Sequence, residues 1–432
     1  MRKIKVNKKD ADRKNRQVGR ALDELIEVHL KVHDRDKTIE NAKKLLALNP
    51  TDPYPVEKLT SVCIDLNEYD TAKAGSDYLE KHFPPSGYRL FLKSRVCDIK
   101  QDYGGCIKYS EQALQIPGND LLTQMMIHNI LGHAYRYVAD APMSLHHYEM
   151  SAKKDISVGK GTDRYPYLFG IKCDDYSNFL FSLHNLNVTR EEIFEGVRHY
   201  DDIFADIKPY TFDPSTHPRH KKIRIGYISP DIRRHVVAFF SYALYKSYDK
   251  SKFEVYCYPK CPEDNVSAEF KAGVDGWQNI LYDNPEVAAK KIKDDEIDIL
   301  VDLSGHTANN CLRVMAYKPA PIQISGIGWF NSTGLKTIDY FLADKFTDPE
   351  GLNDQFFTEK ILRLQHSHFC YMWHDAPIEI QPAPCLKNGY VTFVSFNNFV
   401  KITDEMLKLW ATILERVPNS RLYVKGKAFR SQ

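Results

Sequence analysis

The sequence predicts an α + α/β chain: a helical repeat array followed by a Rossmann-like parallel sheet domain and the start of a second one. Three observations carry this prediction. Features recur every 34 residues in the first half, short apolar strands alternate with helices from residue 223 onward, and polar motifs follow several of those strands. The expected divisions are a basic flexible tail (1–16), the repeats (17–205), a linker (206–222), the first Rossmann-like domain (223–376), a second linker (377–387) and an incomplete second domain (388–432).

Composition narrows the class of protein. A net charge of +2 gives no electrostatic reason to expect nucleic acid or an anionic membrane as a partner. No signal peptide or apolar run long enough to cross a bilayer is present in the sequence. The nine cysteines contain no CxxC pair, which favours reduced thiols and a cytoplasmic location.

The first 16 residues carry eight Lys or Arg against two Asp. A basic arm that contacts nucleic acid and a solvated, frayed terminus both fit this composition. The frayed terminus is the favoured interpretation, because charge runs at chain ends are usually solvated.

Residues 17–205 show the repeat. Tyr69 and Tyr103 lie 34 residues apart in similar sequence contexts, and Pro50 and Pro84 are also 34 apart. A third unit runs through Gly132, one residue out of step. Two amphipathic helices per unit, a small residue at their contact and a closing proline make the tetratricopeptide pattern. A generic helical bundle is the alternative. Stacked units form a curved surface of the kind that binds peptides or proteins.

The pattern changes at residue 223. Strands are expected at 223–229, 253–258, 297–303, 322–326 and 338–343, and helices at 237–248, 286–293 and 310–317. Such alternation predicts a parallel sheet with helices on both faces, and ligands of such sheets bind beyond the carboxyl ends of the strands.

A second unit is expected from Asn388. A strand at 391–396, a helix with Thr403 as its N-cap and a strand at 421–425 make one βαβ unit. A complete domain of this type needs roughly 100–150 residues, so the domain is expected to be incomplete here.

Two histidine motifs follow predicted strands. Ser229–His235 (SPDIRRH) places an imidazole, two arginines and a carboxylate after the first strand, where His235 could orient or deprotonate a hydroxyl. Asp302–Asn310 (DLSGHTANN) follows another strand, and His306 and Thr307 are expected to face the same crevice. A surface loop histidine is the alternative for His235.

Two further motifs complete the set. Ile327–Gly334 (IGWFNSTG) contains Gly328 and Thr333 and could stack a sugar on Trp329 or simply form a turn. In Phe396–Thr403 (FNNFVKIT), Lys401 next to the free N–H groups of a helix start could hold a diphosphate without a metal. A solvated lysine is the alternative there.

A histidine-rich segment, His366–Cys370 (HSHFC) with His374 beyond it, could suggest a metal site. Its spacing fits no standard set of ligands, so no metal is expected.

These four motifs, in this order behind tetratricopeptide-like helices, resemble the O-GlcNAc transferase family (glycosyltransferase family 41), and within it the SPINDLY branch. The resemblance is most specific in residues 305–310, 318–323, 331–340, 388–398, 401–403 and 417–422. It is close over residues 222–432 and loose over the helices. It implies a two-lobed GT-B fold and an inverting, metal-independent protein O-glycosyltransferase that moves GlcNAc from UDP-GlcNAc, or fucose from GDP-fucose, onto Ser or Thr.

The resemblance also implies residue roles. His235 falls on the active-site histidine of the family, and Lys401 on the lysine that neutralises the departing diphosphate. His306, Thr307, Gly328, Thr333 and Asn398 fall on donor- and sugar-binding segments. Acceptor proteins would bind the helical array, a homo-oligomer is possible, and no cofactor beyond the nucleotide-sugar substrate is expected.

Some positions depart from the family pattern. Val400 replaces a tyrosine of the animal enzymes, as in the SPINDLY branch, which weakens the case for UDP-GlcNAc as donor. The phosphate loop and further nucleotide-binding residues of the family have no counterpart up to Gln432. The sequence is therefore expected to be a truncated form that binds nucleotide sugar weakly. A non-catalytic scaffold with a vestigial transferase lobe is the alternative function.

Overall fold

A computed structural model describes residues 8–31, 34–48, 52–213, 215, 218, 220–372 and 379–426. The features expected at residues 1–7, 377–378, Pro50, Pro214 and His374 lie outside these ranges. The chain divides into two compact units, residues 1–171 together with 383–432, and residues 172–382. Each unit is described by itself.

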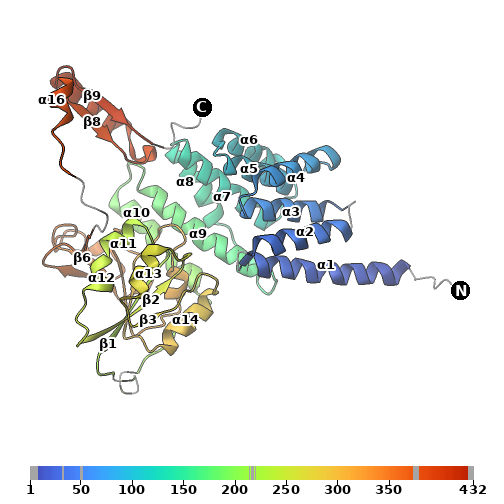
Figure 1. Cartoon of the computed structure of the whole chain (residues 1–432), viewed down its shortest axis with the longest axis horizontal. Helices are drawn as coiled ribbons and strands as arrows, with labels where there is room; N and C mark the ends of the chain where they lie inside the picture. The colour runs from blue at the N-terminus through green and yellow to red at the C-terminus, as the bar shows by residue number, and fades with distance from the viewer. Residues whose placement is uncertain are drawn as a thin grey trace. The chain divides into compact units, whose positions relative to one another are not determined.

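The helical array of the first unit consists of consecutive helices that pack as neighbours along the chain (Figure 1). They are α1 (Lys8–Lys31), α2 (Arg35–Leu48), α3 (Pro53–Asp65), α4 (Tyr69–His82), α5 (Gly87–Ile99), α6 (Tyr103–Gln115), α7 (Leu121–Tyr137) and α8 (Ala141–Ala152). A short 3₁₀ turn, Ser157–Gly159, then leads into α9 (Tyr165–Leu183), which runs from the first unit into the second.

The repeat period is visible in the helix starts. Helices α3, α5 and α7 begin at Pro53, Gly87 and Leu121, which are 34 residues apart. The residue before each start caps the helix: Asp52, Ser86 and Asp120 accept backbone N–H groups of the first turn. Because an N-cap satisfies an otherwise orphaned donor, these three positions fix where the first helix of each unit begins.

The third unit differs from the sequence prediction in its internal length. Helix α7 has 17 residues, whereas α3 and α5 have 13 each. The extra four residues add about one helical turn. The turn that follows is the same in each unit, since Asn67, Gln101 and Ala139 all adopt a left-handed conformation.

Close helix contacts depend on small residues. An added Cβ on Gly132 would lie 2.8 Å from the ring of Tyr148 on α8. Ala72, Ala113 and Ala134 are fully buried within their helix pairs. The predicted role of small residues at the helix–helix contact is therefore confirmed.

The tail differs from its expected form. Helix α1 begins at Lys8, so the part of the 1–16 segment that the structure describes has helical backbone rather than a flexible one.

The second unit holds a seven-stranded sheet in which every pairing is parallel. Its strands are β1 (Ile223–Ser229), β2 (Phe253–Pro259), β3 (Gly276–Trp277), β4 (Ile299–Asp302), β5 (Ile322–Gly326), β6 (Tyr340–Asp344) and β7 (Lys360–Leu364). The order across the sheet is β3-β2-β1-β4-β5-β6-β7. The order therefore reverses direction between β1 and β4.

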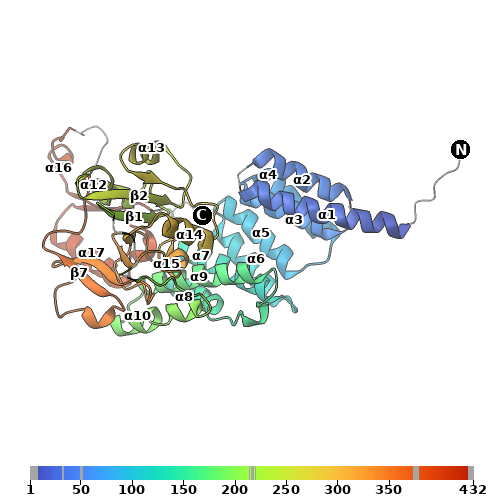
Figure 2. The ribbon, with the colours of Figure 1, turned by 90° about the horizontal axis from the view of Figure 1, so that it is seen from below.

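Helices cover both faces of this sheet (Figure 2). They are α11 (Val236–Phe240), α12 (Tyr242–Lys246), α13 (Asn265–Lys271), α14 (Pro285–Asp294) and α15 (Leu312–Met315). The main core lies between one face and helices α11–α13, where Tyr245 and Phe270 pack against Val255 and Cys257. On the other face, Tyr258 donates to Asp295 at the end of α14. The α/β prediction is confirmed.

Two details of the sheet domain differ from the prediction. The helix expected at 237–248 is broken at Ser241, whose buried hydroxyl donates to the carbonyl of Val237. Such a bond back to the preceding turn competes with the helix ladder. The two edge strands β3 and β7 were not predicted, because β3 has only two residues and the alternation of β7 spans only five.

Helix α10 (Arg190–Val197) and the 3₁₀ turns Tyr200–Phe204 and Asp354–Phe356 complete the second unit. No helix within the described ranges is both long and apolar enough to cross a bilayer.

The 383–426 segment contains a small βαβ unit. Its elements are α16 (Pro384–Asn388), β8 (Thr392–Ser395), a 3₁₀ turn (Phe399–Lys401), α17 (Asp404–Arg416) and β9 (Arg421–Val424). Strands β8 and β9 pair in parallel, and the Thr403 side chain accepts from the backbone N–H of Met406. The predicted strand, N-capped helix and strand are all confirmed.

The contact at Gly132 makes a testable prediction. Gly132→Ala should lower the free energy of unfolding by about 1–3 kcal/mol, because the new methyl group overlaps the Tyr148 ring. Urea unfolding followed by circular dichroism measures the change. Gly104→Ala is the matched control, since its Cβ would meet nothing closer than 3.7 Å, and it should change stability by less than about 1 kcal/mol. Equal losses in both variants would contradict the packing argument.

Candidate functional site

The candidate site lies where the strand order reverses. In open parallel sheets, ligands bind in the crevice beyond the carboxyl ends of the strands at this point. Strands β1 and β4 are paired from Ile225 with Ile299 to Ile228 with Asp302. The loops that follow them contain the two histidine motifs, so the fold brings the 229–235 and 302–310 segments to the same edge.

His235 is the accessible histidine of this edge. It caps α11 in an extended conformation, and its Nδ1 accepts the backbone N–H of Val237 at 3.3 Å. The carboxylate Oδ1 of Asp231 lies 3.4 Å from the same nitrogen. The side chain is 41% exposed, so its Nε2 side is open to a substrate while Nδ1 is held by the protein.

Asp231 is the acid that supports this histidine. Its side chain is only 10% exposed, and its backbone N–H donates to Ser229 Oγ at 3.0 Å. Burial raises the pKa of the Asp231 carboxyl above its ordinary value, while the charge of His235 opposes that rise. The loop therefore holds a buried acid and a half-exposed histidine as a pair.

Asp302 shapes the neighbouring loop. Its fully buried carboxylate accepts from the backbone N–H of Gly305 at 2.8 Å and from the hydroxyls of Ser304 and Ser325 at 2.6 and 2.8 Å. Burial raises the pKa of this carboxyl. These bonds fold the chain back at once after β4 and join it to β5.

His306 lies in a different place from the one expected. Its side chain is 1% exposed, Nδ1 is 3.0 Å from Ser177 Oγ, and Nε2 is 2.9 Å from the carbonyl oxygen of Thr333. Burial lowers the pKa of His306 to about 4. With both nitrogens occupied, His306 is a neutral residue that joins α9 to two loops, and it does not face the crevice.

The other three residues predicted for the site in this domain, Thr307, Gly328 and Thr333, differ in how accessible they are. Thr307 is partly exposed, and its hydroxyl donates to the carbonyl of Ser304. Thr333 is fully buried and donates its backbone N–H and hydroxyl to Glu359. Gly328 cannot carry a side chain, since a Cβ there would overlap the carbonyl oxygen of Leu303. Of these three, only Thr307 and the Gly328 backbone can meet a ligand directly.

Trp329 is not a sugar platform in this structure. It is 5% exposed and packs against Phe181, His184 and His306 with ring centroids 5.1–5.9 Å apart. The alternative considered from sequence, a turn, is closer to the structure, because Ile327 adopts a left-handed φ of 69° just before Gly328. A β-branched residue in that conformation marks a tightly constrained loop.

Asn398 and Lys401 belong to the other unit. Both are exposed, and the backbone N–H of Lys401 donates to the carbonyl of Asn398 at 3.0 Å within the 3₁₀ turn before α17. The lysine thus stands at the start of a capped helix, as the sequence predicted.

The histidine-rich segment is structural where it is described. His368 is 3% exposed, and its Nδ1 lies 2.7 Å from Asp344 Oδ2. Hydrogen bonds from His368 and the neighbouring loop lower the pKa of Asp344. The described residues contain no group of three His, Cys, Asp or Glu side chains placed to hold a metal ion.

Sequence reasoning did not assign a role to Asp231 or to the aromatic residues at the edge. Asp231 lies four residues before His235, and this spacing was the available sign of a contact between the two side chains. In a loop, however, a spacing of four residues does not fix the distance between side chains. Phe330 and Tyr371 are 62% and 54% exposed; Phe330 packs on Phe369, and Tyr371 packs on Phe240 at the end of α11. They add an apolar border to the polar edge.

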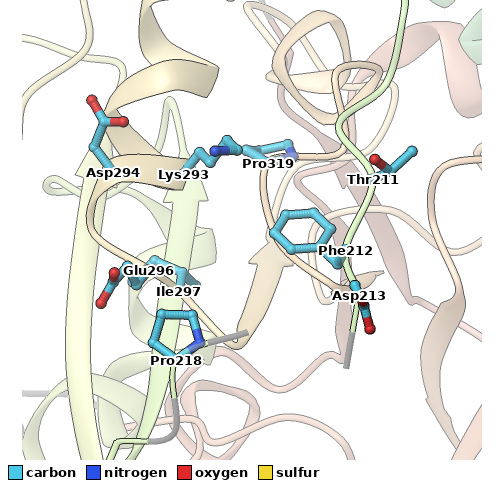
Figure 3. A pocket seen from close by; sticks show the side chains of 9 residues that line it. All are labelled: Thr211, Phe212, Asp213, Pro218, Lys293, Asp294, Glu296, Ile297 and Pro319. Carbon is cyan, nitrogen blue, oxygen red and sulfur yellow. The ribbon is translucent and has the colours of Figure 1, made fainter. Parts of the chain in front are cut away.

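A separate pocket of about 350 Å³ lies near the opposite edge of the sheet (Figure 3). Its walls come from the 206–222 linker, from the end of α14 and from the turns that lead into β4 and β5, and include Phe212, Lys293, Ile297 and Pro319. Because it lies at the amino ends of the strands, it is not the candidate site.

Comparison with known proteins finds similarity to glycosyltransferases over part of the chain. A family model described as glycosyl transferase family 41 matches residues 202–376. The probable UDP-N-acetylglucosamine–peptide N-acetylglucosaminyltransferases SPINDLY of Solanum lycopersicum and Arabidopsis thaliana are 38% and 39% identical over 261 residues. These matches cover 58% of the chain and 28% of each relative, so the chain spans less than a third of their length.

Two further proteins are similar to this chain at lower identity. The probable UDP-N-acetylglucosamine–peptide N-acetylglucosaminyltransferase SEC of Arabidopsis thaliana is 28% identical over 230 residues, which is 49% of the chain and 23% of that relative. The solved structure of a mutant Thermobaculum terrenum O-GlcNAc transferase superposes with a TM-score of 0.66 at 21% identity, covering 96% of this chain and 70% of that one. The latter shows a shared fold, a helical array followed by a parallel sheet.

The burial of His306 predicts a pH dependence of stability. The pKa of His306 is about 6.5 in the unfolded chain and about 4 in the folded chain. Between these two pH values, the unfolded chain therefore holds a proton on His306 that the folded chain lacks. The free energy of unfolding should therefore fall as the pH drops through this window, by about 1.4 kcal/mol per pH unit from His306. Urea unfolding at pH 7 and pH 5, followed by tryptophan fluorescence, measures the fall.

His306→Gln should reduce that difference between pH 7 and pH 5, whatever it does to absolute stability. His199→Gln is the control and should not reduce the difference. His199 is about half exposed, and its carboxylate partners raise its pKa instead of lowering it. A His306→Gln protein with the wild-type pH difference would contradict the assignment of His306 as a buried neutral residue.

Proposed function

We propose that the protein transfers a sugar from a nucleoside diphosphate donor to Ser or Thr hydroxyls of proteins, and the match of residues 202–376 to the glycosyl transferase family 41 model supports this. The observation that carries the proposal is the open His235 beside buried Asp231 at the β1–β4 reversal, where an α/β sheet binds its ligand. The donor is UDP-GlcNAc or GDP-fucose, and the names of the SPINDLY and SEC relatives support the first.

The reaction is a single displacement with inversion. The acceptor oxygen forms a bond to the anomeric carbon, the bond to the diphosphate oxygen breaks, and the acceptor proton leaves for a base. No metal is needed in the proposal, because Lys401 and the N–H groups that start α17 can stabilise the negative charge of the leaving diphosphate.

His235 can serve the acceptor in two ways. While Nδ1 accepts from Val237, the neutral ring carries its proton on Nε2 and can orient the acceptor by donating to it. When the proton sits on Nδ1 and faces Asp231, Nε2 has a free lone pair and can take the acceptor proton. Asp231 therefore favours the form that can act as a base, while the Val237 N–H favours the form that donates to the acceptor.

The helical array is proposed to bind the acceptor proteins, since stacked helix pairs form extended concave surfaces. All nine cysteines are free thiols, which supports a reducing compartment such as the cytoplasm.

Variants at the two proposed site residues test the function. His235→Ala and Lys401→Ala should each lower the rate of sugar transfer about 100-fold or more, because one loses the group next to the acceptor and the other the charge opposite the diphosphate. Transfer from labelled UDP-GlcNAc and GDP-fucose to protein acceptors, with the modified residue found by mass spectrometry, measures the effect. His199→Ala and Lys408→Ala, two exposed residues of the same types, should keep wild-type rates. Full activity in both site variants would overturn the assignment.

The Asp231→Asn variant distinguishes the two proposed roles of His235, which are to orient the acceptor and to take its proton. It should lower kcat about tenfold or more with little change in KM for the acceptor, because the amide no longer favours a proton on Nδ1 of His235. A raised KM with unchanged kcat would show instead that Asp231 serves only to bind the acceptor.

A further inference from the structure

A second pocket opens at the same sheet edge as His235, away from the histidine motifs. It has a volume of about 250 Å³ and lies between α10 and the loops that follow β5 and β6. Its lining includes Arg190, Phe330, Asp348, Asn353, Phe356 and Phe357. Ligand pockets for whole small molecules usually measure about 300–1,000 Å³, so this one suits a single side chain better than a nucleotide sugar.

The pocket holds two buried acceptors. Asp348 is 9% exposed and Asn353 is 4% exposed. The Asn353 amide donates from Nδ2 to Asp348 Oδ1 at 3.0 Å. That bond fixes the orientation of the amide, because turning it over would bring its oxygen against the carboxylate. Within the described ranges, Asn353 Oδ1 is buried and receives no hydrogen bond.

The charge of Asp348 is also poorly compensated. Among the described residues, no Lys, Arg or His side chain forms an ion pair with it, and the nearby Arg363 donates to its backbone carbonyl instead. A buried carboxylate with one neutral donor is costly, and a ligand that brings several N–H donors and a positive charge would remove much of that cost.

The walls define the rest of the ligand. Phe330, Phe356 and Phe357 present aromatic carbon, which can pack on an aliphatic stem or on a planar cation. Arg190 is exposed at the rim, where water and salt weaken its repulsion of a bound cation, and it can donate to a peptide carbonyl. A Lys or Arg side chain fits a pocket with an acidic floor and aromatic walls.

The pocket is connected to the candidate site through aromatic packing. Phe330 lies 5.8 Å from Phe369, and Phe369 lies 4.7 Å from Phe240, centroid to centroid. Phe240 ends α11, the helix that His235 caps. Since Phe330 and Asp348 follow the carboxyl ends of β5 and β6, the pocket and His235 belong to one edge of one sheet.

We propose that this pocket binds a basic side chain of the acceptor polypeptide, near the Ser or Thr that receives the sugar. The inference rests on the proposed function and adds a preference for acceptors with a Lys or Arg close to the modified residue. Asp348 and Asn353 supply the acceptors for its N–H groups, and Phe330 supplies the wall on the side of the candidate site.

Direct binding tests the pocket without relying on catalysis. The probes are capped Ala-Ala-Ser-Ala-Ala peptides in which each alanine in turn is replaced by arginine, together with the matching neutral citrulline peptides. Fluorescence anisotropy with the wild-type protein should show one arginine position that binds roughly tenfold more tightly than its citrulline counterpart. Equal affinities at every position would overturn the proposal with no variant involved.

Two substitutions place the preference in the pocket. Asp348→Asn should abolish the arginine preference, and Asn353→Leu should weaken it, in proteins whose circular dichroism and melting match the wild type. Glu350→Gln removes an exposed charge from the same loop and should leave the preference intact. A preference that persists in Asp348→Asn, or that is lost equally in Glu350→Gln, would place the charge recognition elsewhere and overturn the assignment.

Transfer of sugar to the same peptides separates this inference from the proposed function. Transfer at equal rates to arginine and citrulline peptides would support the function and overturn the pocket assignment. An Asp348-dependent arginine preference in binding, with no transfer from either donor, would support the pocket and overturn the function.

Discussion

The buried carboxylate of Asp302 organises the candidate site. It lies at the end of β4, has no contact with solvent, and receives hydrogen bonds from Ser304, Gly305 and Ser325. A buried acid is tolerated only when such donors surround it, so the chain that follows β4 has one favourable path. That path turns at Gly305, where a Cβ would overlap the Cβ of Trp329.

The turn at Gly305 also determines where the next residue, His306, lies. It directs His306 into the interior, where the ring meets Ser177 on α9, the Thr333 carbonyl and Tyr200. A neutral imidazole with both nitrogens bonded is a connector, and its burial joins the helix that leaves the repeat array to the sheet domain. The histidine that stays accessible is His235 in the loop after β1, where it remains half exposed beside Asp231 and is proposed to act on the acceptor.

The edge of the sheet therefore carries three kinds of surface. His235 and Asp231 form a polar pair, Phe330 and Tyr371 form an apolar border, and Asp348 with Asn353 forms an acidic recess. A polypeptide acceptor needs a group near its hydroxyl, a surface for its backbone and a pocket for a neighbouring side chain. These three surfaces match those needs, which supports the proposed polypeptide acceptor over a free sugar.

The sequence by itself determined the architecture and the end of the sheet where the candidate site lies. The 34-residue spacing of Tyr69 and Tyr103 and the change of period at Ile223 are local signals, so the helices and strands could be predicted from them. Motif position after strands located the edge, because parallel strands all end on one side. Only the tertiary structure decided which motif residues reach that edge. His235 and His306 look alike in sequence, yet α9 and Trp329 bury only His306. The acids Asp231 and Asp348 pair with His235 and Asn353 across four and five residues of irregular loop, whose geometry the sequence does not specify.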